Sequence, residues 1–223
     1  QRSVQIVSAA IEKGVKRFIL VHTTGIYSKY KEAGEGYRQI DAKVKEICEE
    51  AKATLTILRP TMIYGSLNDG NISVFIKMVD KLRLFPVING AKYELQPVWC
   101  KDLGKAFYDV LMNPEITDSK EYDLSGGKPI LLIDIFKEIG NQLGVKNTFI
   151  SVPSGIAYLG AWIVYILTFK KKDYREKVQR MVEPRAYSHE KAANDFNYSP
   201  HEFKDGVKEE IIMYKQLKET KNK

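Results

Sequence analysis

One tyrosine and one lysine stand at a spacing that can do acid–base chemistry. Tyr27 and Lys31 form a literal Tyr-x-x-x-Lys. On one helix this spacing places an ammonium beside a phenol and favours the phenolate. The stretch that follows, EAGEG, has two glycines and no apolar period, which argues against such a helix. We therefore interpret the spacing as coincidental and look to the elements around it.

The flanking segments predict a parallel sheet with helices. Apolar residues from Val4 to Ile11 follow a helical period that Gly14 ends. The continuous apolar runs RFILVH and TLTILRP are typical of strands buried on both faces. A helix pattern over Tyr37 to Ala51 separates them. Helix, strand, helix and strand with short links predict an α/β fold with crossover connections.

The remaining chain has a more mixed pattern. Short strands are predicted in PVING, KYELQPV and EYDLSGG, and the pair Gly126-Gly127 is expected to form an ordinary turn. The helices expected in this part cover residues 72–84, 102–112, 133–143, 173–181 and 203–218.

Composition limits the classes of function. Hydrophobic residues make up 44% and charged residues 28%, which is typical of a soluble globular protein. Cys48 and Cys100 lie in apolar segments without metal-ligand spacing, so we expect no metal site and a cytoplasmic location. The net charge of +7 is spread over many segments without interleaved aromatic residues, so nucleic-acid binding is not favoured.

An apolar stretch near the C-terminal end has two possible interpretations. Residues 155–169 are mostly apolar and precede three lysines at 170–172. The stretch is shorter than the roughly 20 residues that span a bilayer. A helix buried in the core is the main expectation. The alternative is peripheral membrane contact through 155–172, with the lysines at the lipid headgroups.

Four blocks of sequence carry a resemblance to a known family. GVKRFILVHTTGIY, LTILRPTMIYG, QPVWCKDLGKAF and SPHEFKDGVKEEI resemble, in order and spacing, the extended or atypical short-chain dehydrogenases/reductases, the NAD-dependent epimerase/dehydratase family. The resemblance implies a Rossmann-like parallel sheet, NAD or NADP as cofactor, a small-molecule substrate and a possible homodimer. The glycine-rich loop of the family does not occur in this sequence, which therefore resembles the C-terminal portion of a family member.

The same resemblance implies a division of the chain and a set of site residues. Residues 1–65 and 97–125 would form the partial dinucleotide-binding unit, and 66–96 and 126–223 a small mixed α/β substrate-side subdomain. Thr23 would hydrogen-bond the reacting oxygen, and Tyr37, at the family's spacing before Arg59, would be the catalytic tyrosine. The implied cofactor contacts are Val21, His22, Pro60, Thr61 and Met62, and the implied substrate contacts are Thr24, Asn71 and Arg185.

Two positions depart from the family pattern. Asp41 stands one turn after Tyr37, where the family has lysine, and its negative charge would disfavour the phenolate. Lys45 lies too far along the helix to replace that lysine and is expected to pair with Asp41. Leu95 stands where nucleotide-sugar epimerases of the family carry an arginine for the diphosphate, which counts against such a substrate.

Two functions follow from these observations. The first is an NAD(P)-dependent oxidoreductase or epimerase that acts on a small carbonyl or hydroxyl substrate through a weakened proton relay. In that case, replacing Asp41 with lysine is expected to raise turnover. The second is a non-catalytic dinucleotide-binding or regulatory module of the same fold.

Overall fold

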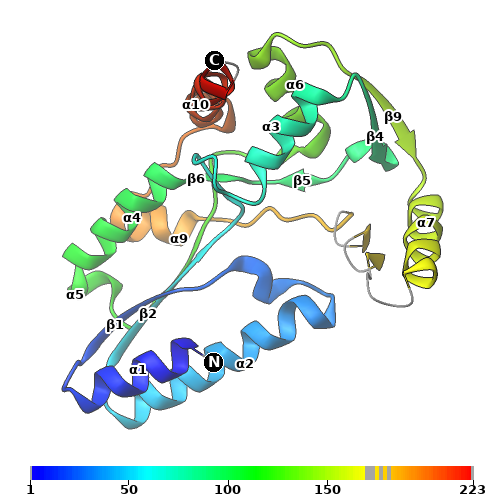
Figure 1. Cartoon of the computed structure of the whole chain (residues 1–223). Helices are drawn as coiled ribbons and strands as arrows, with labels where there is room; N and C mark the ends of the chain where they lie inside the picture. Colours follow the sequence, from blue (N-terminus) through cyan, green and yellow to red (C-terminus); the bar gives the residue numbers. More distant parts are fainter. Residues whose placement is uncertain (1, 169–173, 176–177, 180–181, 222–223) are drawn as a thin grey trace. The chain divides into compact units, whose positions relative to one another are not determined.

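The computed structural model describes residues 2–168, 174–175, 178–179 and 182–221 (Figure 1). They divide into two compact units. Unit 1 is Gln1–Thr61, Lys101–Ser125 and Tyr187–Pro200, and unit 2 is Met62–Cys100, Gly126–Ala186 and His201–Lys223. The segment Tyr187–Pro200 therefore belongs to unit 1, whereas the sequence-based division placed it in the substrate-side subdomain.

Unit 1 begins with alternating helices and strands. These are α1 (Arg2–Glu12), β1 (Arg17–Val21), α2 (Lys31–Glu50) and β2 (Thr54–Pro60). Val7 of α1 and Val44 and Cys48 of α2 form a small buried core, and Phe18 and Leu55 of the two strands pack against it. The apolar sides of the two helices therefore pack against the apolar strands, as the sequence patterns predict.

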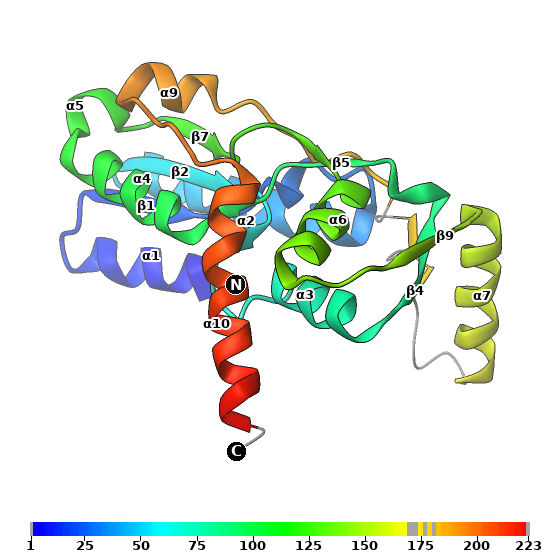
Figure 2. The same ribbon diagram turned by 90° about the horizontal axis from the view of Figure 1, so that it is seen from above.

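The sheet of unit 1 is parallel and three-stranded. Its order is β1-β2-β7, with β7 at Glu121–Leu124. Arg17 of β1 is opposite Thr54, and Ile57 of β2 is opposite Glu121. The helices α4 (Cys100–Met112) and α9 (Glu190–Phe196), with the short α5 (Pro114–Thr117), lie on the face opposite α1 and α2 (Figures 1 and 2). The predicted α/β class, a parallel sheet with flanking helices, is confirmed.

The start of α2 differs from the sequence-based expectation. The helix begins at Lys31 rather than Tyr37 and runs through Gly34 and Gly36. Each glycine costs a helix interior about 1 kcal/mol, and packing of the later apolar face offsets that cost. Tyr27 lies in a separate 3-10 helix, η1 (Thr24–Tyr27), so Tyr27 and Lys31 do not share one helix.

Unit 2 is a mixed α/β unit built from short elements. Its helices are α3 (Ile72–Lys81), η2 (Asn89–Ala91), α6 (Leu132–Leu143), α7 (Ser154–Leu167) and α10 (Phe203–Lys221). Its strands are β3 (Ile63–Tyr64), β4 (Leu84–Ile88), β5 (Glu94–Leu95), β6 (Val98–Trp99), β8 (Ile130–Leu131) and β9 (Thr148–Val152). They form three two-stranded pairs: β3-β6 and β4-β9 are parallel, and β5-β8 is antiparallel. Ile76, Ile135, Ile139, Phe85 and Val207 lie in the apolar core of the unit.

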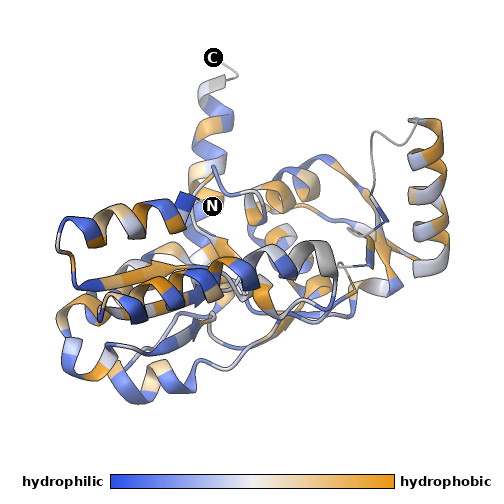
Figure 3. Cartoon of the chain, turned by 90° about the horizontal axis from the view of Figure 1, so that it is seen from below, coloured by the Kyte–Doolittle hydropathy of each residue, from blue (hydrophilic) through white to orange (hydrophobic). Residues whose placement is uncertain are grey.

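The apolar helix α7 is not part of that core. Ala161 is buried, whereas most of the larger apolar side chains of α7 are exposed. Figure 3, which colours the ribbon by hydropathy, shows hydrophobic residues along this helix. The expectation of a buried helix is therefore wrong. Within the described residues, no helix is both long and apolar enough to cross a membrane. The helix expected at 173–181 falls partly outside the described residues.

Candidate active site

The carboxyl ends of the unit 1 strands bring several predicted residues together. The backbone N–H of His22 donates to the carbonyl of Leu58 at 2.8 Å, and that of Thr61 donates to the carbonyl of Leu124 at 3.1 Å. Val21, His22, Pro60 and Thr61, the predicted cofactor contacts of this unit, thus lie at adjoining strand ends. In open parallel sheets, ligands bind outside this edge.

Two adjacent threonines at this edge have different roles. The Thr23 hydroxyl accepts a hydrogen bond from the N–H of Gly25 at 3.0 Å and caps η1. Since a hydroxyl is one donor and two acceptors, its proton is still available for a ligand. Thr24 is buried, and its hydroxyl donates to the carbonyl of Pro60 at 3.4 Å. Thr24 therefore ties two strand ends together, and its predicted substrate contact stays a prediction.

Gly25 allows the two predicted catalytic residues to approach each other. A Cβ at Gly25 would lie 3.3 Å from Oγ1 of Thr23 and 3.3 Å from a ring carbon of Tyr37. Any larger residue would push into one of them. The ring of Tyr37 is 40% exposed, so a ligand can reach it. The structure thus places a threonine hydroxyl and an accessible tyrosine ring next to the same glycine.

Asp41 faces away from solvent and contacts two basic groups. Its Oδ1 lies 2.5 Å from Nδ1 of His22, and its Oδ2 accepts a hydrogen bond from Arg59 at 2.6 Å. Burial alone would raise the pKa of Asp41, but the contacts with His22 and Arg59 outweigh burial and lower it. The His22 ring also meets the ring of Tyr37 edge-on, at 5.2 Å between centroids and 84° between planes. Asp41 is therefore connected to Tyr37 through an imidazole.

The charge network continues from Arg59 to the surface. Arg59 pairs with Glu121 at 2.6 Å, and Glu121 in turn pairs with Lys45. Lys45 therefore pairs with Glu121, and the expected pair with Asp41 is wrong. Burial would raise the pKa of Glu121, but hydrogen bonds from Lys45 and Arg59 lower it. An arginine within a buried strand needs a carboxylate partner, and this signal in the sequence could have predicted an acidic neighbour.

Tyr27 is held in a different environment from Tyr37. Its hydroxyl lies 3.0 and 3.1 Å from the two carboxylate oxygens of Asp123 on β7. Burial, followed by the charge of Asp123, raises the pKa of Tyr27 to about 12. A phenol at that pKa is a poor proton acceptor near neutral pH, which agrees with the interpretation of its spacing to Lys31 as coincidental.

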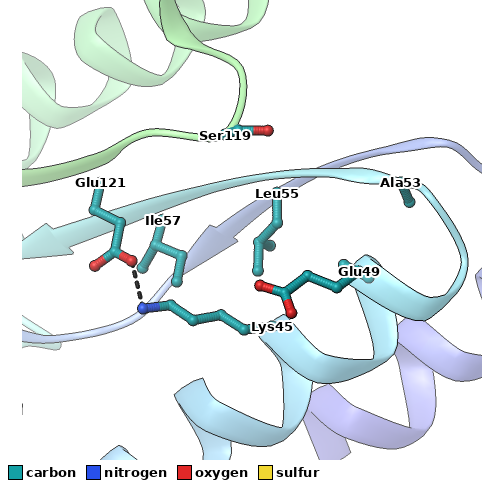
Figure 4. Close-up of a pocket in the computed structure, with 8 residues that line it drawn as sticks. Lys45, Glu49, Ala53, Leu55, Ile57, Ser119 and Glu121 are labelled. Carbon is teal, nitrogen blue, oxygen red and sulfur yellow. Dashed lines mark ion pairs between the residues drawn. The ribbon is translucent and has the colours of Figure 1, made fainter.

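Two pockets open beside α2 in unit 1. One has a volume of about 340 Å³ and is lined by Tyr27, Arg38, Asp41, Arg59 and Glu121, among others. The other, of about 270 Å³, is drawn in Figure 4: Lys45 points to Glu121, and Glu49, Leu55 and Ile57 are among the other lining residues. Cys48 also lines this second pocket, and burial raises the pKa of its thiol. Neither pocket includes Thr23 or Tyr37 among its lining residues.

The remaining predicted site residues belong to unit 2. The carbonyl of Met62 accepts the N–H of Val98 at 2.9 Å. The N–H of Asn71, at the start of α3, donates to Asp69 at 2.8 Å. The N–H of Arg185 donates to the carbonyl of Glu94 at 2.8 Å. These contacts are internal to unit 2, so the ligand roles predicted for the three residues stay predictions. The described residues contain no group of three or more His, Cys, Asp or Glu side chains able to hold a metal ion.

Comparison with known proteins reveals similar folds without close sequence relatives. No protein-family model and no curated protein matches this sequence. A structure of UDP-glucose 4-epimerase from Thermotoga maritima with UDP-glucose superposes with a TM-score of 0.72 and 16% identity, over 95% of this chain and 67% of that one. UDP-glucuronic acid 4-epimerase from Bacillus cereus in complex with NAD has a TM-score of 0.73 and 14% identity, over 96% of this chain and 66% of that one.

A third similar structure is a sugar-nucleotide dehydratase. DesIV, a dTDP-glucose 4,6-dehydratase from Streptomyces venezuelae with NAD bound, has a TM-score of 0.71 and 14% identity, over 96% of this chain and 64% of that one. The chain thus spans about two thirds of the length of the three structures. At these identities, the likeness establishes the α/β fold that the sequence predicted.

Proposed function

We propose that the protein is an NAD(P)-dependent oxidoreductase or epimerase that acts on a small carbonyl or hydroxyl substrate. The observation that carries this proposal is the placement of both Thr23 and Tyr37 next to Gly25, at the carboxyl edge of a parallel sheet. Two enzymes with this fold were solved with NAD bound, which supports the choice of cofactor.

The residues at the sheet edge fit the nicotinamide end of a dinucleotide. Val21 ends β1 with an apolar side chain that is 48% exposed, and Pro60 and Thr61 follow on the neighbouring strand end. This edge offers an apolar surface with backbone hydrogen-bonding groups nearby, and such a surface suits the nicotinamide ring. The nicotinamide, when bound, supplies or accepts the hydride.

Thr23 and Tyr37 have complementary roles in this proposal. Because the N–H of Gly25 donates to Oγ1 of Thr23, the Thr23 hydroxyl is oriented and can donate a hydrogen bond to the reacting oxygen of the substrate. Tyr37 transfers the single proton of the reaction, donating it to the oxygen during reduction of a carbonyl and accepting it during oxidation of a hydroxyl.

His22 and Asp41 take the place of the family's lysine. Asp41 holds the His22 imidazole in place, because its Oδ1 lies 2.5 Å from Nδ1. The imidazole in turn meets the Tyr37 ring edge-on and so orients the phenol. Arg59 balances the remaining charge of Asp41, so the carboxylate does not act on Tyr37 alone.

The substrate is proposed to be smaller than a nucleotide sugar. Leu95, where a diphosphate-binding arginine is expected in nucleotide-sugar epimerases, is 3% exposed and paired with Ile130 across β5 and β8. An apolar side chain at this position offers no hydrogen bond to a phosphate. We therefore expect small aldehydes, ketones or alcohols to be better substrates than UDP-glucose.

A non-catalytic dinucleotide-binding module is the second candidate. Asp41 is engaged by Arg59 and His22, and Lys45 is engaged by Glu121, so neither position one or two turns after Tyr37 supplies an ammonium to it. If the imidazole does not replace that ammonium, the fold can bind the dinucleotide without turnover.

Two tyrosine variants separate these functions. We expect Tyr37→Phe to lower carbonyl reduction by about 100-fold or more without changing NADH or NADPH affinity. Tyr27→Phe is the matched control, because Tyr27 is similarly exposed at 46% but pairs with Asp123. Fluorescence titration of both nucleotides is performed on this chain and on a version extended upstream in its reading frame. Dinucleotide binding without turnover supports the second candidate, and binding of neither nucleotide to either version rejects both candidates.

A further inference from the structure

The helix α7 presents an apolar face to solvent. Ile156, Leu159, Ile163 and Ile166 recur at three- and four-residue spacings and therefore lie on one side of the helix. They are 62%, 54%, 45% and 48% exposed, respectively, while Ala161, on the other side, is 7% exposed. The helix thus attaches through a small residue and exposes its large ones, which is the reverse of a helix that packs on a core.

Neither a membrane-spanning helix nor a core helix explains the apolar character of α7. It has 14 residues, or about 21 Å at 1.5 Å per residue, which is too short for the roughly 30 Å hydrocarbon core of a bilayer. It is also not a core helix, because unit 2 has its own apolar core that does not include α7 residues. A short apolar helix outside a core is typical of a segment that lies in a membrane interface.

Aromatic and basic residues at α7 favour a lipid surface over a protein surface. Trp162 and Tyr158 are 45% and 37% exposed, and such rings prefer the headgroup level of a bilayer. Three consecutive lysines at 170–172 follow the helix in the sequence. A basic run next to an apolar helix in the sequence is complementary to anionic headgroups.

We propose that α7 binds the surface of an anionic phospholipid membrane, with its Ile156–Leu159–Ile163–Ile166 face in the acyl boundary. The three lysines that follow α7 in the sequence supply positive charge that suits anionic headgroups. This binding is independent of the proposed oxidoreductase function, because α7 contains none of the predicted catalytic residues. It would hold a substrate-processing domain at a lipid surface.

The proposal is tested by sedimentation with vesicles. We expect the 223-residue chain to bind vesicles of phosphatidylcholine and phosphatidylserine, with less binding as salt is raised, and to bind phosphatidylcholine alone more weakly. The double variant Leu159→Glu and Ile163→Glu should bind at least about tenfold more weakly. Replacing the three lysines with glutamine should lower binding to the phosphatidylserine vesicles and leave binding to phosphatidylcholine alone unchanged.

A matched control makes the test specific to α7. Tyr108 and Leu111 on α4 also lie on one side of a helix and are 62% and 53% exposed. The double variant Tyr108→Glu and Leu111→Glu should bind vesicles as the wild type does, and all variants should unfold at the same temperature. Absence of vesicle binding, or binding that the α7 variant does not weaken, would overturn the proposal. So would a wild-type dimer that the α7 variant dissociates in the absence of any vesicle binding, because a second copy would then cover this face.

Discussion

Two buried carboxyl groups, one in each unit, show how neighbours decide the charge of an acid. Asp41 in unit 1 is 3% exposed and Glu210 in unit 2 is 0% exposed. Arg59 and His22 lie against Asp41, and its pKa is lowered in spite of burial. Glu210 accepts the N–H of Gly65 at 2.9 Å, but burial and then the carboxyl of Asp69 raise its pKa to about 8. Similar burial therefore gives opposite charge states at neutral pH, because His22 and Arg59 hydrogen-bond Asp41, whereas burial and Asp69 outweigh the smaller effect of Lys77 on Glu210.

The two acids also couple folding to pH in opposite directions. The pKa of Asp41 is lower in the folded chain, so its stabilising contribution is present above its unfolded pKa and is lost as pH falls through the folded value. The pKa of Glu210 is higher in the folded chain. Its contribution is present below the unfolded pKa, and it is lost as pH rises through about 8.

Reversal of the charge at Asp41 should have the largest effect on stability. Asp41→Lys would put an ammonium against Arg59 and His22, and we expect it to lower the free energy of unfolding by more than about 4 kcal/mol. Asp41→Asn, which removes the charge and keeps the shape, should lower it by about 3 kcal/mol. Urea unfolding measures both.

The outcome for Asp41→Lys also decides between the prediction made from the sequence and the prediction made from the structure. From the sequence, lysine at this position was expected to restore the relay and raise turnover. The contact with Arg59 predicts a poorly folded protein instead. A stable Asp41→Lys variant with raised turnover would show that Asp41 is not the required partner of Arg59.

Removal of the ionisable group at Glu210 should produce the next largest effect. The wild type is expected to lose about 2 kcal/mol of stability between pH 6 and pH 9 as Glu210 ionises. Glu210→Gln should remove most of this loss, because the amide stays neutral. Glu209→Gln is the matched control, since Glu209 is its exposed neighbour on α10. Thermal unfolding as a function of pH tests this, and an unchanged slope in Glu210→Gln would exclude Glu210 as its source.

A substitution at Asp69 tests what raises the pKa of Glu210. Asp69 raises the pKa of Glu210 through a hydrogen bond and through its charge. Asp69→Asn removes that charge, while Oδ1 can still accept the N–H groups of Asn71 and Ser73. The loss of stability with rising pH should therefore be smaller and be complete at a lower pH. A pH profile identical to that of the wild type would mean that burial alone raises the pKa.

Removal of the Lys45–Glu121 ion pair, at the exposed end of the Asp41 network, should have the smallest effect on stability. Lys45 and Glu121 are 41% and 38% exposed at their side chains, so their ion pair is largely solvated. We expect Lys45→Ala to cost about 0.5 kcal/mol or less, and the cost should decrease as salt is raised. Lys43→Ala is the control, because Lys43 pairs with Glu46 outside this network. A loss as large as that of Asp41→Asn would mean that Lys45 is needed to hold Glu121 against Arg59.

Regular patterns in the sequence predicted most of the fold. The apolar runs in β1 and β2 and the apolar period of α1 and α6 each fall on an element close to the predicted bounds. The start of α2 was missed, because two glycines in EAGEG lower the local helix propensity and only the packing of the later turns overcomes it.

The candidate site was predicted in part. The order of residues in the chain sufficed to place Val21, His22 and Thr23 at a strand end, since a strand end is a local feature. It did not reveal that Asp41 pairs with Arg59, that Lys45 pairs with Glu121, or that His22 lies between Asp41 and Tyr37. Each of these contacts joins residues from different elements, so helical spacing on α2 alone predicted the wrong partners.

The sequence by itself determined the α/β class, the order of helices and strands, and the residue types at the carboxyl edge of the sheet. These depend on periodicity and on local backbone preferences, which are written in neighbouring residues. Only the tertiary structure decided which carboxyl groups are paired with cations and which are protonated, and that α7 has its apolar side outward. Those features depend on which distant segments meet when the chain packs, because Coulomb and desolvation energies are set by neighbours in space.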